Sequence, residues 1–232
     1  MNILFLTVAG EMGLGHLNRC IAISEAFKEK KIKTSFILKA PKNVIPYHKI
    51  NLIENFDWIN NKIKLSHYLK RFNAVLIDNI YLKKIRFNEI INSVENIIYI
   101  DDYKRWKHSK GIIIDWTIGA KKVYPNTEYL IGPKFIALRK VFLKPIKKKV
   151  NKKIKNILIT FGGSDQRKLT LKITEIVKNY YPCSDINIII GKNFENKKNF
   201  INSKNINFIF FPEDTTISKL MQIADIAIEN GA

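Results

Sequence analysis

Several residue types that mark whole classes of protein are scarce in this chain of 232 residues. The two cysteines, Cys20 and Cys183, form no C-x-x-C pair, and the four histidines form no H-E-x-x-H pair, which argues against a disulfide framework and a metal site. No apolar run approaches the roughly 20 residues needed to cross a bilayer, and no basic segment precedes the first apolar run. We therefore expect a cytoplasmic protein with no signal peptide, metal or cofactor.

Acidic residues are half as frequent as basic ones, with 20 Asp and Glu against 40 Lys and Arg, and the formal net charge is +20. Such a charge favours anionic partners such as nucleotides, nucleic acid or an anionic membrane surface. AT-rich coding explains the same abundance of Lys, Asn and Ile without any selection for binding. The basic residues are spread along the chain, so we expect no nucleic-acid partner. A weak association with an anionic membrane surface stays open as an alternative.

Apolar runs alternate with segments of helical spacing, which is typical of an α/β fold. The expected strands are residues 3–8, 34–38, 49–54, 74–78, 97–100, 112–115, 157–161, 186–190, 206–211 and 226–228. The expected helices are residues 21–30, 58–70, 83–93, 169–180 and 216–224. This βαβ order predicts two Rossmann-like, doubly wound domains.

The clearest break in composition is residues 144–155, which hold seven lysines. We interpret this stretch as an exposed basic linker between a first domain, residues 1–143, and a second, residues 156–232. A role for the lysines in following a phosphate backbone or a membrane surface is the alternative. Only about four strands are expected in the second domain, which therefore looks truncated beside a usual doubly wound unit.

A glycine-rich stretch, residues 13–20, joins the first expected strand to the first helix. Gly13 and Gly15 would let the backbone approach a phosphate at the helix N-terminus. His16 and Arg19 would lie one helical turn apart and face the same ligand. The stretch is not a dinucleotide fingerprint, because Asn18 stands where that fingerprint has Gly or Ala. The alternative is that the glycines serve turn geometry and His16 is structural.

Aspartates follow three of the expected strands: Asp78, the pair Asp101 and Asp102, and Asp115. In open parallel sheets, ligands bind beyond the carboxyl ends of the strands. These side chains are therefore predicted to border the same crevice as His16. The alternative is that they cap the turns or helices that follow, and for Asp115 we favour capping.

A second strand, glycine turn and helix begin the second domain. The turn consists of Gly162, Gly163, Ser164 and Asp165, and its last two residues can each cap the helix that follows.

Six motifs in order resemble one family: residues 13–20, 77–78, 100–102, 132–142, 161–165 and 224–228. It is the UDP-2,4-diacetamido-2,4,6-trideoxy-β-L-altropyranose hydrolase of pseudaminic acid biosynthesis, with related spore-coat polysaccharide biosynthesis proteins. The resemblance implies a GT-B-type arrangement of the two domains with a cleft between them, and a UDP-sugar substrate. The motifs span nearly the whole chain.

The resemblance also implies a mechanism in which UDP leaves the anomeric carbon and water replaces it. His16 falls on the family's proposed catalytic histidine, a residue whose ordinary pKa suits proton transfer near neutral pH. Backbone N–H groups of the second glycine turn would hold the leaving diphosphate. Arg19 would add positive charge or tie the helix to the sheet. The expected binding residues are Gly13, Gly15, Arg19, Asp78, Tyr81, Asp101, Gly162, Gly163, Ser164 and Asp165.

Three departures from the family pattern affect the interpretation. Phe5 and Thr7 stand where the family often has Arg and Asp, and Tyr81 lies one residue beyond the family's usual tyrosine position. The chain also stops at Ala232, before the family's nucleotide-binding glutamate, so we expect a fragment, a truncated product or an inactive relative. A GT-B glycosyltransferase and a non-catalytic nucleic-acid-binding protein are the competing hypotheses. The sequence leaves the sugar and the oligomeric state open.

Overall fold

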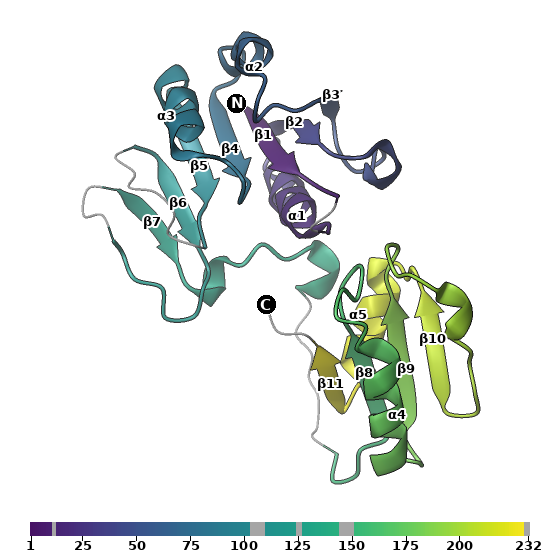
Figure 1. Cartoon of the computed structure of the whole chain (residues 1–232). Helices are drawn as coiled ribbons and strands as arrows, with labels where there is room; N and C mark the ends of the chain where they lie inside the picture. Colours follow the sequence, from purple (N-terminus) through teal and green to yellow (C-terminus); the bar gives the residue numbers. More distant parts are fainter. Residues whose placement is uncertain (11–12, 103–109, 124–126, 144–150, 230–232) are drawn as a thin grey trace. The chain divides into compact units, whose positions relative to one another are not determined.

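The computed structural model describes residues 1–10, 13–102, 110–123, 127–143 and 151–229. The chain divides into two compact units, Met1–Lys140 and Val141–Ala232, each with its own parallel sheet (Figure 1). Residues 144–150 of the predicted linker lie outside the described residues. Of the helices that the structure describes, none has both the length and the apolar character needed to cross a membrane.

The first unit is built on seven strands in the order β3-β2-β1-β4-β5-β6-β7, and every neighbouring pair is parallel. The strands are β1 Asn2–Val8, β2 Lys33–Lys39, β3 Leu52–Asn55, β4 Ala74–Asp78, β5 Asn96–Ile100, β6 Ile112–Asp115 and β7 Glu128–Ile131. The helices are α1 Gly15–Glu29, α2 Lys62–Leu69 and α3 Lys84–Ser93, with short 3-10 helices η1 Lys42–Val44 and η2 Pro133–Phe135. The strand order reverses between β1 and β4, which is the topological switch point where such sheets bind ligands.

Both faces of the first sheet are buried, as the continuous apolar strands predict. Alternate side chains of β1 enter different cores: Ile3 and Phe5 pack with α1 residues such as Leu17, whereas Leu4 and Leu6 pack toward α2 and α3. Helix α1 therefore covers one face of the sheet, and α2 and α3 cover the other, so the unit is doubly wound.

The second unit repeats this plan with four parallel strands in the order β10-β9-β8-β11. The short 3-10 helix η3, Lys140–Phe142, begins at the last residue of the first unit. The elements of the second unit that follow are β8 Asn156–Thr160, α4 Thr170–Tyr180, β9 Asp185–Ile190, η4 Lys197–Asn199, β10 Ile206–Phe210, α5 Asp214–Ile223 and β11 Ile226–Glu229. Ile157 and Ile159 face the core under α4, and Leu158 faces the core under α5. The order reverses between β8 and β11.

The predicted fold class, two Rossmann-like parallel-sheet units, is confirmed. The prediction differs most from the structure at α1, α2 and β7. Helix α1 begins at Gly15 rather than at residue 21, so His16 and Arg19 lie on the helix itself. Helix α2 begins at Lys62 rather than at residue 58, because Trp58 is fully buried outside the helix and its Nε1 donates to the Thr7 carbonyl at 3.0 Å. Strand β7 was not predicted.

Candidate functional site

The switch point of the first sheet brings His16, Arg19 and Asp78 together. Helix α1 begins with Gly15, so His16 and Arg19 occupy its first two turns. Asp78 is the last residue of β4, which pairs in parallel with β1, and it lies directly beside Thr7. The carboxylate of Asp78 is fully buried and faces the start of α1. Residues 62 positions apart in the chain therefore share one site.

Asp78 accepts hydrogen bonds from both α1 side chains. His16 Nδ1 lies 2.7 Å from Asp78 Oδ1. The Arg19 guanidinium forms a two-pronged pair with the same carboxylate, Nε to Oδ2 at 2.5 Å and Nη2 to Oδ1 at 2.6 Å. Arg19 Nη1 donates to Asp102 Oδ2 at 2.8 Å. Such forked contacts are among the strongest hydrogen bonds in proteins, and here they join α1 to the ends of β4 and β5.

These contacts decide the charge of the cluster. Burial alone would raise the pKa of Asp78, but the hydrogen bonds from His16 and Arg19 and their charges hold it below its usual value. Burial works against the charge of Arg19, and the hydrogen bonds and charges of Asp78 and Asp102 outweigh it, so the pKa of Arg19 is raised. Asp78 is therefore an ionised carboxylate and Arg19 a guanidinium.

The same geometry favours one tautomer of His16. Its Nδ1 lies 2.7 Å from Asp78 Oδ1 and 2.9 Å from Arg19 Nη2. A carboxylate can only accept, whereas a guanidinium nitrogen can only donate. Since Arg19 Nη2 already donates to Asp78 Oδ1, the shorter contact assigns the proton to Nδ1. The Nε2 lone pair of a neutral His16 is then left to accept a proton, the arrangement in which a carboxylate orients a histidine base.

Two further side chains complete the surroundings of this cluster. The Trp116 ring lies 5.1 Å from the guanidinium carbon of Arg19, within the range of a cation–π contact. Cys20 is buried with its Sγ 3.8 Å from Asp78 Oδ2, and burial and the Asp78 charge raise the pKa of its thiol. Neither was predicted as a site residue, and Asp102 was predicted at the crevice but not as a binding residue.

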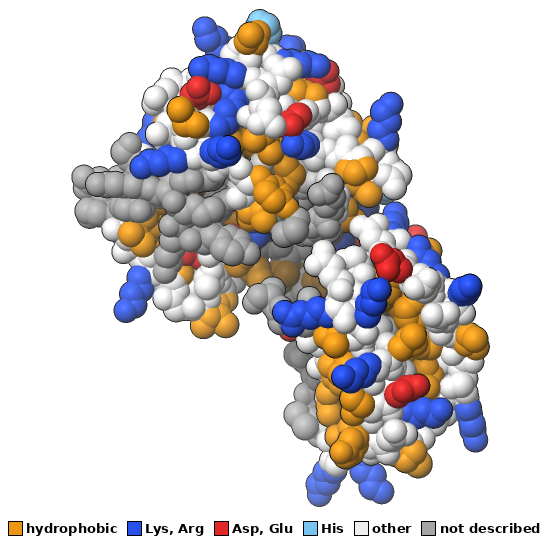
Figure 2. All heavy atoms as spheres, in the orientation of Figure 1, with side chains coloured by type: hydrophobic (Ala, Val, Ile, Leu, Met, Phe, Trp, Pro, Cys, Tyr) orange, Lys and Arg blue, Asp and Glu red, His pale blue; other side chains and the backbone are white. Residues whose placement is uncertain are grey.

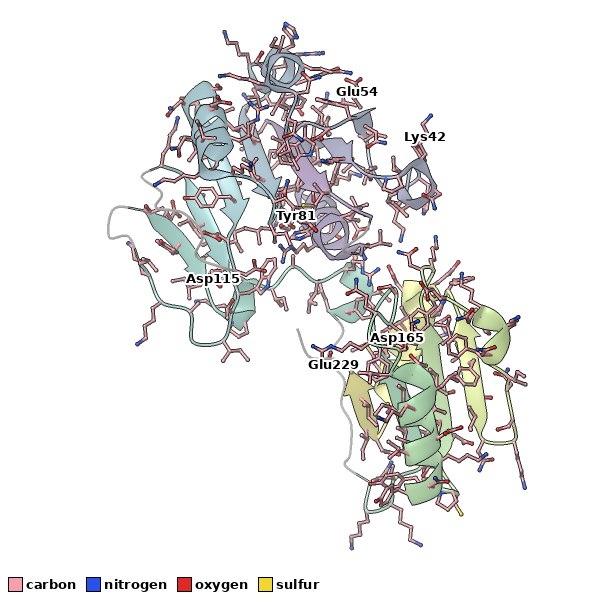
Figure 3. The ribbon with its side chains drawn as sticks, in the orientation of Figure 1. Lys42, Glu54, Tyr81, Asp115, Asp165 and Glu229 are labelled. Carbon is pink, nitrogen blue, oxygen red and sulfur yellow. The ribbon has the colours of Figure 1, made fainter. Side chains whose placement is uncertain are left out.

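The other predicted aspartates take different places. Asp101 is buried, and its backbone N–H donates to the Ile114 carbonyl at 3.0 Å; its neighbour Asp102 is the residue that reaches Arg19. Asp115, labelled in Figure 3, accepts from the Thr117 N–H at 3.0 Å and so closes the turn after β6. The favoured alternative for Asp115, a turn-capping role, is confirmed.

A pocket of about 940 Å³ opens beside His16 at the carboxyl ends of the first unit's strands. Gly13, His16 and Tyr81 line it, and Tyr81, which Figure 3 labels, has a half-exposed side chain. The pocket's ionic side chains are largely paired with one another. The pairs are Lys39 with Asp57 at 2.8 Å, Lys62 with Glu89 at 2.7 Å and Arg86 with Glu89 at 2.9 Å.

Backbone hydrogen bonds join the two ends of the first glycine loop. Gly10 and Gly13 exchange backbone hydrogen bonds of 3.1 and 2.8 Å. Gly13 has a φ of +91°, a conformation that L side chains rarely adopt. A Cβ at Gly15 would meet no described atom within 4 Å, and no described side chain caps the N-terminus of α1. The predicted glycine-rich turn before a helix N-terminus is therefore present.

The second glycine loop differs from the expected phosphate cradle. Asp165, labelled in Figure 3, accepts from the N–H groups of Leu169 and Thr170, both at 2.9 Å. The helix begins at Thr170 and its N-cap is Leu169, so the prediction that Ser164 or Asp165 would be the N-cap is wrong. The Asp165 carboxylate nevertheless bonds the N–H of the first residue of α4. Gly162 has a φ of +73°, and Ser164 and Asp165 line a separate hollow of about 390 Å³.

Among the described residues, no group of three His, Cys, Asp or Glu side chains is placed to hold a metal ion. The cluster around Asp78 instead combines two carboxylates, one guanidinium and one imidazole. That set can orient a base and hold α1 against the sheet.

No family model matches the sequence. A curated relative, an uncharacterized protein of Methanocaldococcus jannaschii, is 25% identical over 94% of this chain and 49% of its own length. The chain therefore spans about half the length of the curated relative that it matches.

Several solved structures share the fold. MurG of Acinetobacter baumannii matches 99% of this chain and 73% of its own, with a TM-score of 0.61 and 12% identity. The UDP-GlcNAc 2-epimerase of Neisseria meningitidis, solved with UDP-GlcNAc, matches 100% of this chain and 78% of its own, with a TM-score of 0.59 and 14% identity. HepE of Anabaena, solved with UDP and glucose, matches 98% of this chain and 73% of its own, with a TM-score of 0.58 and 12% identity. These likenesses show a GT-B glycosyltransferase-like fold.

Proposed function

We propose that the chain acts on a UDP-linked sugar and hydrolyses it at the anomeric carbon, releasing UDP and the free sugar. The hydrogen bond between His16 Nδ1 and ionised Asp78 carries this proposal, because it leaves His16 Nε2 as a base at the switch point of the sheet. The structural neighbours bound to UDP-GlcNAc and to UDP support a nucleotide-sugar substrate. The resemblance to the pseudaminic acid hydrolases supports a diacetamido-trideoxy sugar.

In the proposed reaction, His16 Nε2 takes a proton from a water molecule. The water oxygen bonds to the anomeric carbon while the bond from that carbon to the β-phosphate oxygen breaks, and UDP leaves with the electron pair. Asp78 stays ionised and stabilises the imidazolium that forms. A positioned base of this kind contributes about 10²–10⁴-fold to a rate.

The remaining predicted residues divide by what their side chains already contact. Arg19 is engaged by two carboxylates, which favours its tie between α1 and the sheet over a direct contact with phosphate. Tyr81 and Gly13 line the pocket beside His16 and are proposed to contact the sugar. Backbone N–H groups of Gly162, Gly163 and Ser164 are proposed to contact the diphosphate.

The test is UDP release from the UDP-linked diacetamido sugar with no acceptor present. The wild-type chain and the His67→Ala variant should release UDP alike, since His67 is an exposed residue of α2 that lies outside the site. His16→Ala should lower the rate at least about 100-fold, with UDP affinity by calorimetry changed less than fivefold. Equal turnover by His16→Ala would overturn the catalytic assignment.

A glycosyltransferase that passes the sugar to an acceptor is the second candidate. The pocket beside His16, at about 940 Å³, lies near the upper end of the roughly 300–1,000 Å³ typical of ligand sites, so it has room for an acceptor next to a sugar. Under this hypothesis, UDP release stays at background with donor alone and rises when an acceptor glycan is added. Release without acceptor favours the hydrolase.

A further inference from the structure

We propose that the second unit carries its own binding site for a neutral sugar ring. The site is the hollow of about 390 Å³ between the loops that follow β8 and β9. All of its lining residues, from Ser164 to Phe200, belong to the second unit. The proposal goes beyond the hydrolysis proposed above and does not depend on it.

Two glycines bring the walls of this hollow together. A Cβ at Gly191, at the end of β9, would lie 2.5 Å from the carbonyl oxygen of Gly163, so only glycine permits this approach of the two loops. The Asn193 N–H donates to the same carbonyl at 3.0 Å. Farther out, Lys168 and Glu195 reach across from the two loops to within 3.7 Å. The two loops that form the walls of the hollow are therefore held together by backbone contacts.

Half of the polar side chains that line the hollow are amides, those of Gln166, Asn193, Asn196 and Asn199. No hydrogen bond joins these four amide groups to the other residues that the structure describes. Each amide presents an acceptor oxygen beside a donor nitrogen. Neighbouring hydroxyl groups of a sugar, each of which both donates and accepts, match that pattern.

The charged groups of the lining already have partners. Asp165 uses both carboxylate oxygens on backbone N–H groups at the start of α4. Lys168 and Glu195 face each other and are about three-quarters exposed. Each charged side chain of the described lining thus has a partner, and the Asp165 carboxylate keeps its negative charge, which favours a neutral ligand over a phosphate or a carboxylate.

The apolar lining favours a sugar over a nucleobase. The rings of Phe194 and Phe200 meet edge to face, 5.9 Å apart at 65°, and so form a corner rather than a parallel slot for a flat base. A pyranose ring has an apolar C–H face that suits such a corner. The hollow also lies on the β9 side of β8, whereas the switch point, where a nucleotide is expected, lies between β8 and β11.

The test is NMR titration of the ¹⁵N-labelled full chain with N-acetylglucosamine and, separately, with uridine. N-acetylglucosamine should shift the side-chain NH₂ signals of Asn193 and Asn199 saturably at millimolar concentrations. The double variant Asn193→Ala/Asn199→Ala should bind the sugar at least fivefold more weakly. The control Asn179→Ala removes an exposed amide from α4, outside the hollow, and should bind as the wild type does.

Circular dichroism should show the same melting temperature for the double variant and the control, so that lost binding is not lost folding. Unshifted amide signals in the wild type, or equal affinity in the double variant, would overturn the proposal. Shifts caused by uridine but not by N-acetylglucosamine would also overturn it, and would assign the hollow to a nucleoside. UDP release by the double variant, measured separately, reports on the proposed hydrolysis alone.

Discussion

The buried carboxylate of Asp78 accepts hydrogen bonds from two side chains of α1. It holds His16 by Nδ1 and Arg19 by two prongs, so removing its charge would affect both the orientation of the base and the packing of α1. Removing the charge of Asp78 is costly, because the partly buried Arg19 guanidinium then keeps only Asp102 as a charged partner. The functional and the structural roles of this residue can therefore be separated only by measuring both.

Asp78→Asn should reduce UDP release by about 10²–10⁴-fold, since an amide no longer selects the Nδ1–H tautomer of His16. The value of KM should change little. The matched control is Asp115→Asn, which alters a strand-end carboxylate whose partner, among the residues that the structure describes, is the Thr117 N–H. Steady-state kinetics on both variants decide the matter: equal kcat values would remove Asp78 from the mechanism.

The stability cost of Asp78→Asn should depend on pH. The pKa of Asp78 is lowered in the folded chain, so the unfolded state, with a pKa of about 3.9, takes up the proton first as pH falls. The stabilisation is thus complete well above pH 4 and declines toward pH 3. Urea unfolding at pH 6 should show the variant less stable by about 3 kcal/mol, and the gap should narrow at pH 3. A gap that widens as pH falls would contradict this assignment.

At the residue scale, the sequence could predict only those site residues that belong to a recognisable sequence motif. The glycine-rich stretch pointed to His16 and Arg19, and the strand-then-acid pattern pointed to Asp78. Two adjacent aspartates in a sequence do not reveal which of them contacts Arg19. That depends on the conformation of the turn after β5, which brings Asp102 to Arg19. Trp116 contacts Arg19 although the two residues lie far apart in the sequence. The residues around Trp116 do not indicate that contact.

At the element scale, loops at the carboxyl ends of the strands are held by backbone geometry. The turn after β8 rests against the end of β9, with Gly191 in contact with Gly163. A Cβ at Gly163 itself would meet no described atom within 4 Å, and its φ is not positive. A methyl group at Gly191 would therefore clash with the backbone of Gly163, whereas a methyl group at Gly163 would meet open space.

Gly191→Ala should destabilise the second unit by about 1–3 kcal/mol, because the new methyl group must displace the backbone of Gly163. Gly163→Ala, the matched control, should stay within about 0.5 kcal/mol of the wild type. Chemical unfolding of both variants provides the comparison. If Gly191→Ala proved as stable as the control, the close approach of the two loops would be wrong.

Most strands could be predicted because continuous apolar runs flanked by turn residues are typical of buried parallel strands. The prediction was wrong where tertiary contacts override local pattern. Trp58 has helical spacing with its neighbours, yet it is fixed outside α2 by its bond to the Thr7 carbonyl and by Arg86, which donates to the Trp58 carbonyl at 3.1 Å. Strand β7, Glu128–Ile131, is short, partly exposed and at the sheet edge, so its apolar signal is weak.

At the scale of the whole molecule, each unit has cores of its own. The cores of the first sheet draw only on residues up to Phe135, and those of the second only on residues from Ile154 onward. Lys and Arg side chains are dispersed over the visible face of each unit rather than gathered in one stripe (Figure 2). Separate cores of this kind are what allow domains to fold independently.

A chain ending at Lys140 should therefore fold on its own. We expect residues 1–140 to unfold cooperatively and to keep the His16 ring signals of the full chain, since the whole Asp78 cluster lies within this unit. Thermal unfolding and NMR of the fragment check this. A broad, non-cooperative transition would show that the first unit depends on the second.

The tautomer of His16 is the sharpest test of the proposed catalysis, because proton transfer to Nε2 requires that Asp78 hold the proton on Nδ1. Long-range ¹⁵N–¹H correlation of the His16 ring can be measured above pH 8, where an ordinary imidazole is neutral. We expect a protonated Nδ1 and a bare Nε2 in the wild-type chain. A protonated Nε2, with Nδ1 instead accepting from Arg19 at the 2.9 Å contact, would leave no base facing the substrate and would overturn the proposed role of His16.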